Sequence, residues 1–220
     1  MARRILPDFV AAFDGLATAT ATMRTEAAPQ RVHIAALPAV AQLWLSPRLP
    51  ALRKAAPHIA VSITVFEAPP NLKRAPFDLA IFYRRRGEGI ALDEDVIFPV
   101  CTPAIARGLR EPADLRGVTC LTDAVWAEDW AVWMKKAAAG ATFAPRGPVY
   151  SLYALALAEA VNGAGVLMAH EALVRAELAS GRLVAPFETR VPLPRVLSVA
   201  AATKAKKGSA ADRVVALLRS

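Results

Sequence analysis

Residues 147–187, GPVYSLYALALAEAVNGAGVLMAHEALVRAELASGRLVAPF, contain the pattern that decides the fold class. The stretch predicts a strand edge, a helix, a strand and a second helix at 147–150, 151–161, 166–169 and 171–179. Ser151 is predicted to cap the first helix, because a serine oxygen can accept a hydrogen bond from a free helix N–H. Asn162-Gly163 and Gly181 are predicted to end the two helices, because these residues accept positive φ. Strands separated by helices of this length predict βαβ units and parallel sheets.

The same alternation extends through most of the chain. Further strands are predicted at 31–36, 59–66, 77–83, 96–101, 118–122 and 195–202, and further helices at 38–55, from 103, at 128–139 and at 210–218. The run FDLAIFY (77–83) is almost wholly apolar, as expected of a strand buried on both faces. Pro47 and Pro50 are expected to bend or divide the helix 38–55.

The N-terminal segment carries a different pattern, an apolar seam at heptad spacing. Its members are separated by three and four residues in turn: Leu6, Phe9, Phe13, Leu16, Thr20 and Met23. A helix with one narrow apolar stripe needs a partner, and TEAAPQ (25–30) is interpreted as a linker. We therefore expect this helix to pair with another chain. The alternative is an amphipathic helix that lies on its own domain.

Length and composition exclude several classes of protein. The 220 residues are enough for two α/β lobes, and no apolar run reaches the roughly 18 residues of a membrane span. Pro7, Asp8 and Asp14 interrupt any signal-peptide core, so a cytoplasmic location and no membrane partner are expected. The net charge of +8 is dispersed, with its densest groups at 84–86 and 204–207, and is interpreted as a solvated surface.

Cysteines and histidines give no metal-ligand spacing. Cys101 and Cys120 are the two cysteines, and three histidines are scattered along the chain. Neither a disulfide scaffold nor a metal site nor any cofactor is predicted. Cys101 is interpreted as a small buried residue rather than a nucleophile, since no base stands beside it in the sequence.

From residue 32 to about residue 203 the chain resembles the effector-binding domain of LysR-type transcriptional regulators, in particular the branch of the glycine-cleavage activator and the β-lactamase regulator. The resemblance is carried by LPAVAQLWLSPRLPALRKAAPHIAVSI (37–63), FDLAIFY (77–83), FPVCTPAIA (98–106), PADLRGVTCL (112–121), WAEDWAVWMKKAAAG (126–140) and the stretch 147–187. Residues 3–24 look like the linker helix through which these regulators dimerise. The family's winged helix-turn-helix has no counterpart before residue 30.

The resemblance implies an α/β fold of two Rossmann-like lobes, like that of type 2 periplasmic binding proteins, with an N-terminal linker helix. The linker helix would be 1–28, lobe I 30–101 with 201–220, and lobe II 102–200. Crossovers near Thr102 and Ala200 would act as hinges, and a small anionic metabolite would bind in the cleft. Open parallel sheets bind ligands beyond their carboxyl edges, and helix N–H groups attract anions, which supports that location independently.

Residues at the predicted strand ends are the candidate effector contacts: Leu37, Pro38, Ala39, Phe66, Glu67, Tyr83, Thr102, Thr122, Asp123, Tyr150, Ser151, Met168 and His170. Leu37 and Ala39 are apolar where related members often carry hydroxyl residues, which weakens the transfer of a serine-held carboxylate ligand. Each polar candidate has a structural alternative. Ser151, Thr122 and Asp123 can simply cap a helix or a turn, and His170 can make a structural hydrogen bond instead of sensing pH.

The expected role is that of a ligand-sensing domain that controls DNA-templated transcription, not that of an enzyme. The expected partners are a small-molecule effector, a second copy of the chain in a homodimer or tetramer, and DNA only through a helix-turn-helix. The predicted dimer contacts are apolar residues of three helices: Leu6, Phe9, Phe13, Leu16, Met23, Leu43, Leu155 and Ala158. The alternatives are a solute-binding protein or an enzyme on the same fold. They lack the export signal and the convergent acid, base or nucleophile that each would need.

Overall fold

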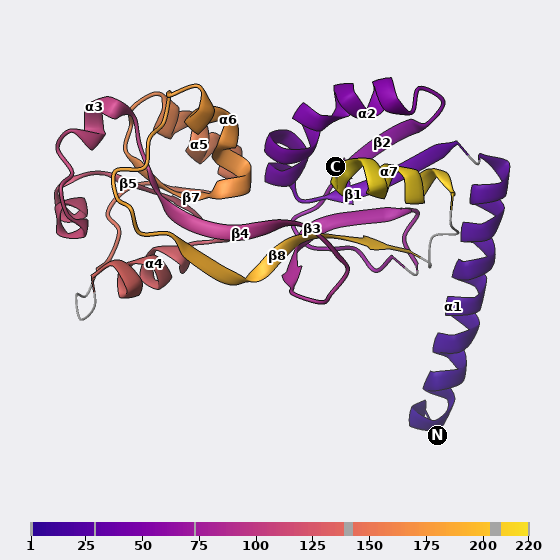
Figure 1. Ribbon diagram of the computed structural model, residues 1–220. Coiled ribbons are helices and arrows are strands. Elements are labelled where there is room, and N and C mark those ends of the chain that lie inside the picture. Colours follow the sequence, from indigo (N-terminus) through magenta and orange to yellow (C-terminus); the bar gives the residue numbers. More distant parts are fainter. Residues whose placement is uncertain (1, 29, 73, 139–142, 203–207, 220) are drawn as a thin grey trace. The chain divides into compact units, whose positions relative to one another are not determined.

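A computed structural model describes residues 2–28, 30–72, 74–138, 143–202 and 208–219 of the chain (Figure 1). Its strands are β1 (Arg31–Ala36), β2 (Ala60–Val65), β3 (Leu79–Arg85), β4 (Ile90–Val100), β5 (Cys120–Asp123), β6 (Val149–Tyr150), β7 (Val166–His170) and β8 (Val191–Ala201). The α-helices are α1 (Ala2–Ala27), α2 (Leu49–Ala55), α3 (Pro103–Ala106), α4 (Asp129–Ala137), α5 (Tyr153–Val161), α6 (Glu171–Ala179) and α7 (Ala210–Arg219). A π-helix, Val40–Leu45, and 3₁₀ turns at Ser46–Arg48 and Pro112–Gly117 complete the set. The strand order is β2-β1-β3-β8-β4-β7-β5-β6.

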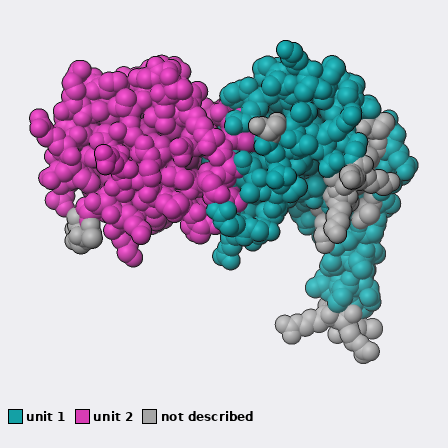
Figure 2. Space-filling model, viewed as in Figure 1, with its two compact units in different colours: residues 1–41, 45–92, 197–220 teal, residues 42–44, 93–196 magenta. Residues whose placement is uncertain are grey.

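The chain forms two compact units, drawn in different colours in Figure 2. Unit 1 comprises residues 1–41, 45–92 and 197–220, and unit 2 comprises residues 42–44 and 93–196. The strands β4 and β8 each begin in one unit and end in the other. The predicted lobe boundaries at 101/102 and 200/201 therefore lie four to nine residues beyond the points where the compact units divide.

Unit 1 is built on parallel strands. Its β1 pairs with β2 on one side and with β3 on the other, both in parallel. Ile34, Leu79 and Ile81 are fully buried, which agrees with the apolar character of the predicted strands. The helices α2 and α7 pack together, and α7 packs on β1. The segment 38–55 is divided at Ser46–Arg48 as its prolines predicted.

Unit 2 contains both parallel and antiparallel pairs. The strand β5 is parallel to β6 and β7, but β4 is antiparallel to β7, with Ile97 opposite His170. The expectation of parallel sheets was wrong for the pair of β4 and β7. Parallel neighbours need a long crossover connection, usually a helix. Only residues 86–89 join β3 to β4, and this short turn reverses the direction of the chain.

The core of unit 2 is aromatic and contains both cysteines. Trp130, Trp133 and Met134 of α4 are buried against Cys101 and Cys120. The indole of Trp133 donates a hydrogen bond to the carbonyl of Thr189 at 3.1 Å. The interpretation of Cys101 as a small buried residue is confirmed, and Cys120 is buried as well.

Several predicted boundaries were wrong. Ser151 does not cap α5, because the helix begins at Tyr153 with Leu152 as its N-cap residue and no side-chain cap. The strands β4 and β8 begin six and four residues earlier than predicted, in half-exposed segments whose polar residues hid the pattern. The helix α1 continues to Ala27, so residues 25–27 are helical rather than linker. Ala139, predicted as the end of a helix, and the basic group 204–207 lie outside the described residues.

The helix α1 exposes its apolar seam. Leu6, Phe9, Phe13, Leu16 and Met23 are each between 58% and 69% exposed. Asp14, on the same helix, accepts a hydrogen bond from Arg74 Nε at 3.0 Å. Among the described residues, no helix is both long and apolar enough to cross a membrane.

Candidate functional site

The carboxyl ends of β1, β2 and β3 bring one group of predicted site residues together in unit 1. The Leu37 N–H donates to the Ile81 carbonyl at 3.3 Å, and the Phe66 N–H donates to the Ala36 carbonyl at 3.0 Å. Tyr83 lies further along β3, two residues after Ile81, which is the partner of Ala36 in the register. Three segments that are distant in the sequence therefore meet at one sheet edge, which we call edge 1 (residues 37–39, 66–67 and 83).

The side chains of edge 1 differ in their access to solvent. Leu37 and Ala39 are buried, Phe66 and Tyr83 are partly buried, and Glu67 is exposed. What this edge offers from residues 37–39 is therefore mainly backbone. The helical segment that follows has no acidic residue in its first turn, so its N–H groups remain suited to an anion.

A second group of predicted residues meets in unit 2. The register of β5 with its neighbours places Thr122 opposite Val149 and Asp123 opposite Tyr150, while Leu121 lies opposite Leu167. The ends of β5, β6 and β7 therefore form a common edge, edge 2 (residues 122–123, 150–151 and 168–170). Thr102 lies elsewhere, at the start of α3.

Asp123 shapes the loop that leaves edge 2. Its Oδ1 accepts hydrogen bonds from the Val125 N–H at 2.9 Å and the Trp126 N–H at 3.2 Å. This confirms the structural alternative for Asp123, since its carboxylate caps a turn. The side chains of Thr122 and Met168 are buried, whereas Ser151 is exposed and Tyr150 partly so.

His170 does not present its side chain to solvent at edge 2. Its Nδ1 lies 2.8 Å from Asp95 Oδ1, and its Nε2 lies 3.4 Å from Asp129 Oδ2. Arg195 joins the two carboxylates: its Nε donates to Asp95 at 2.6 Å and its NH2 donates to Asp129 at 2.5 Å. Asp95, Asp129 and His170 are buried and the Arg195 side chain is 29% exposed. These four residues are called the charge cluster below.

Aromatic rings and a phenol surround the imidazole of the charge cluster. The Trp126 ring lies on the His170 ring with their centroids 4.0 Å apart, and it meets the Tyr153 ring edge-on at 5.2 Å. The backbone N–H of His170 donates to the Tyr153 hydroxyl at 3.2 Å. The same Trp126 belongs to the turn capped by Asp123, so the loop of edge 2 rests on the charge cluster.

Burial and charge act against each other in the pKa values of the charge cluster. Burial tends to raise the pKa of Asp95, but the hydrogen bonds and charges of His170 and Arg195 outweigh it and hold that pKa below its ordinary value. For Asp129 burial prevails over the charges of His170 and Arg195, and its pKa is raised. Burial also raises the pKa of the Tyr153 phenol, which therefore stays protonated.

Sequence reasoning found only one of the four residues of the charge cluster. Asp95 and Arg195 are 100 residues apart in the chain and meet because β4 and β8 are neighbours in the sheet. The charged run 93–95 lies just before the predicted strand 96–101. An acidic residue next to an apolar strand was the only signal available, and it is a weak one.

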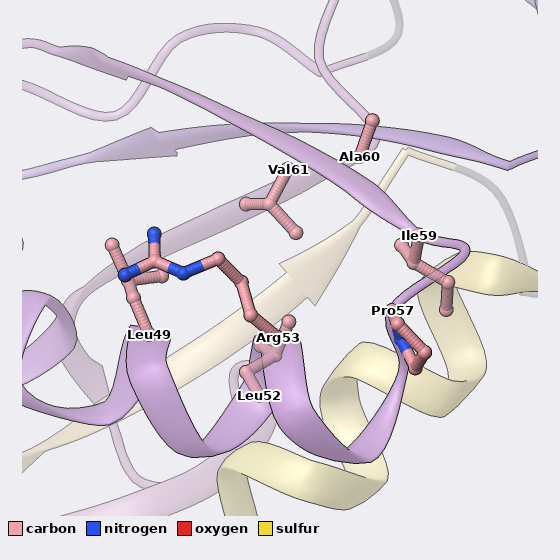
Figure 3. A pocket seen from close by; sticks show the side chains of 7 residues that line it. All are labelled: Leu49, Leu52, Arg53, Pro57, Ile59, Ala60 and Val61. Atoms are coloured by element: carbon pink, nitrogen blue, oxygen red, sulfur yellow. The ribbon is translucent and has the colours of Figure 1, made fainter.

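A separate hollow of about 470 Å³ lies on unit 1 (Figure 3). It is lined by Leu49, Leu52, Arg53, Pro57, Ile59, Ala60 and Val61. In Figure 3 the guanidinium of Arg53 extends along the helix toward Leu49. The hollow is at the amino end of β2, whereas Phe66 of edge 1 follows the carboxyl end of that strand. It is therefore distinct from edge 1.

The described residues offer little covalent chemistry. Burial raises the pKa of the Cys101 and Cys120 thiols to about 11, so neither is a thiolate near neutral pH. No described group of three or more histidines, cysteines or carboxylates is arranged to hold a metal ion. The buried imidazole of His170 lies between two carboxylates, and the hydroxyl that accepts a hydrogen bond from its backbone N–H is the Tyr153 phenol, whose pKa is raised.

Comparison with known proteins assigns the chain to a family. Residues 26–220 match the family model of the LysR substrate binding domain. The chain belongs to this family. It is 31% identical over 182 residues to the glycine cleavage system transcriptional activator of Escherichia coli K12, which covers 80% of this chain and 59% of that protein. It is 37% identical over 161 residues to the transcriptional activator AmpR of Rhodobacter capsulatus, covering 70% of this chain and 54% of that protein. The chain thus spans less than two thirds of these relatives.

Solved structures agree with this family. The effector domain of the regulator AmpR of Pseudomonas aeruginosa superposes with a TM-score of 0.72 at 26% identity, covering 86% of this chain and 93% of that one. The full-length virulence activator AphB of Vibrio cholerae superposes with a TM-score of 0.67 over 99% of this chain and 77% of that one. At 16% identity that second likeness supports the fold alone. The fold is the α/β, type 2 periplasmic-binding-protein-like fold of LysR-type effector domains, as the resemblance implied.

Proposed function

We propose that this LysR substrate-binding domain is a non-enzymatic sensor that binds a small anionic metabolite at the carboxyl ends of its strands and controls DNA-templated transcription. The observation that carries the proposal is the meeting of strand carboxyl ends at two edges, each next to helix starts. Ligands of open α/β sheets bind at such edges, where backbone N–H groups are available. The similar proteins named above are transcriptional activators, which supports a regulatory rather than an enzymatic role and, with it, a cytoplasmic location.

The charges at the helix starts favour an anion and indicate where it would bind. The first turn of α5, which follows edge 2, has no acidic residue, and neither has the helical segment after edge 1. The helix α6, by contrast, begins with Glu171, which repels an anion. The anionic group is therefore expected beside Pro38–Ala39 or Tyr150–Ser151, where Ser151 is exposed.

We further propose that the sensor acts as a homodimer or tetramer and reaches DNA through a helix-turn-helix. The exposed seam of α1 supports the dimer, because covering five large apolar side chains on one stripe lowers the free energy of the protein in water. Leu155 and Ala158 of α5 are exposed as well, while Leu43 is partly buried. These residues remain the candidate dimer contacts.

A thermal-shift screen of organic acids, amino acids and aromatic carboxylates tests the proposal. A compound present at 100 times its Kd should stabilise the domain by about 2.7 kcal/mol. The shift should decrease in Ser151→Asp, which places a negative charge at edge 2, and persist in the matched variant Ser180→Asp at the end of α6. Hydrolysis or conversion of a binder, or a flat response to all three classes, would contradict the proposal.

A further inference from the structure

The contacts of the charge cluster are best satisfied by one proton more than a neutral His170 ring and two ionised carboxylates would carry. Each nitrogen of the His170 ring faces a different carboxylate, Asp95 at 2.8 Å and Asp129 at 3.4 Å. A neutral imidazole has a proton on only one nitrogen and a lone pair on the other. In the neutral ring, one lone pair would therefore point at a carboxylate oxygen. One more proton, on the ring or on Asp129, removes that repulsion.

The charge balance of the cluster depends on the same proton. With it, the two carboxylates are balanced by His170 and Arg195; without it, the buried cluster carries a net negative charge. An unbalanced buried charge is costly, because water cannot solvate it. Burial raises the pKa of Asp129, although the charges of His170 and Arg195 oppose this, so Asp129 can share the proton with the ring.

The groups around the imidazole come from every element that packs on it. The carboxylates of Asp95 and Asp129 come from β4 and α4, the guanidinium of Arg195 comes from β8, and the phenol of Tyr153 comes from α5. Glu171 is the next residue in the chain, at the start of α6. Trp126 covers the ring and carries no charge, so it can report on the ring without titrating itself.

We propose that the charge cluster is a proton-responsive support for the loop 123–128 of edge 2. Loss of the shared proton changes the charge next to the Trp126 ring, and the backbone N–H of Trp126 donates a hydrogen bond to Asp123 Oδ1. The loop therefore takes up a different position when the proton leaves. Since edge 2 is the proposed effector site, and this consequence rests on that proposed function, effector affinity becomes dependent on pH.

The test follows tryptophan fluorescence of the full chain from about pH 5 to about pH 9, without any effector. The wild-type emission should show one transition, because an imidazolium next to an indole quenches it. The transition should be lost in His170→Gln and in Trp126→Phe. Trp126 is only partly buried, so the second variant keeps the charge cluster intact and guards against a simple failure of the first variant to fold.

Nuclear magnetic resonance of the histidine rings supplies the independent readout. The chain has three histidines, so His33 and His58 serve as internal references for His170. In Trp126→Phe the His170 ring signal should still report the change in protonation of the charge cluster, although the fluorescence transition is gone. A wild-type protein without the transition, or a transition that survives in both variants, would overturn the proposal. Neither measurement uses a ligand, so a failed effector screen would refute the proposed function and leave this inference standing.

Discussion

Arg195 is the side chain on which the charge balance of unit 2 depends. It contacts both buried carboxylates of the charge cluster, and its own pKa is raised: burial would lower it, but Asp129 and Asp95 more than compensate. Breaking a buried ion pair leaves an uncompensated charge and is far more costly than breaking an exposed one. Replacing different arginines of this domain should therefore lower the free energy of unfolding by different amounts.

Replacing Arg195 should test this unevenness directly. We expect Arg195→Met to lower the free energy of unfolding by about 3 kcal/mol, because two carboxylates lose their partner in a buried site. The matched variant Arg182→Met removes a pair with Glu177 in which the arginine side chain is 58% exposed, and it should cost about 1 kcal/mol or less. Urea denaturation of the three proteins at pH 7 measures both values. Equal losses in the two variants would mean that the cluster is not a buried network.

Acid should act through Asp95. Its pKa is lower in the folded state than the ordinary value of 3.8, so its ionised form stabilises the fold. That contribution is complete above about pH 4 and is lost as the pH falls through the lower folded pKa. Denaturation curves at pH 7, 4 and 3 should show a fall in stability that is smaller in Asp95→Asn. An identical acid dependence in the two proteins would contradict this assignment.

The two thiols should be unreactive in the native protein. Burial raises the pKa of both Cys101 and Cys120 to about 11, and the thiolate is the reactive form. We expect no reaction with a disulfide reagent at pH 8 within the time in which the denatured protein reacts with two equivalents. Fast reaction of a native thiol would show that one of them is reached by solvent.

At the scale of elements, the turn between β3 and β4 carries a tight backbone contact. Gly87 and Gly89 both have positive φ, at 94° and 98°. A Cβ on Gly89 would lie 2.7 Å from the carbonyl oxygen of Val199, whereas a Cβ on Gly87 would meet nothing within 4 Å. The turn thus lets β8 pass close to it, and only one of its glycines is needed for that approach.

Alanine substitutions distinguish the backbone strain of a positive φ from a steric clash with the Val199 carbonyl in this turn. Gly87→Ala should cost about 1 kcal/mol, the price of a positive φ for a residue with a Cβ. Gly89→Ala should cost about 1–3 kcal/mol more, because the Val199 carbonyl must also move. Thermal unfolding of both variants measures the difference. An equal loss of unfolding free energy in the two variants would show that the Val199 backbone can move away from the new Cβ at no energetic cost.

Elements were predicted well where the apolar residues follow one clear helical or strand period. They were predicted poorly where contacts with other parts of the fold determine the structure. The helix α6 was predicted with its observed ends, and the division of 38–55 followed from its prolines. The first halves of β4 and β8 were missed because half-exposed strands carry polar residues without a clear alternation. Ser151 misled because a good capping residue was one position too early for the helix that follows.

The strand ends that form the candidate site could be predicted from the sequence, but the side-chain contacts beneath them could not. Strand ends can be located from periodicity, so edges 1 and 2 could be anticipated residue by residue. The charge cluster could not, because its members come from β4, α4, β7 and β8 and meet only through the strand order. His170 was chosen for its place at a strand end, while its partners needed the register to be known.

At the scale of the whole molecule, the exposed seam of α1 predicts self-association. Phe13→Glu should weaken the dimer at least about tenfold, because a buried phenylalanine contributes about 1.5–3 kcal/mol and ten-fold corresponds to about 1.4 kcal/mol. Ala11→Glu adds the same charge to an exposed position away from the seam and should leave the dimer unchanged. Sedimentation equilibrium measures both constants. A monomeric wild-type chain, or equal weakening by the two variants, would refute the seam as an interface.

The most direct test of the account is to map where a binder contacts the chain. Amide chemical shifts of the labelled protein, titrated with the strongest compound from the thermal screen, should change at Leu37 and Ala39 and at residues 66–67, 122–123 and 150–151. The amides around the Arg53 hollow should keep their shifts and serve as the internal control. Changes confined to that hollow, with none at the strand ends, would contradict the central claim that this domain senses its ligand at the carboxyl edges of its sheet.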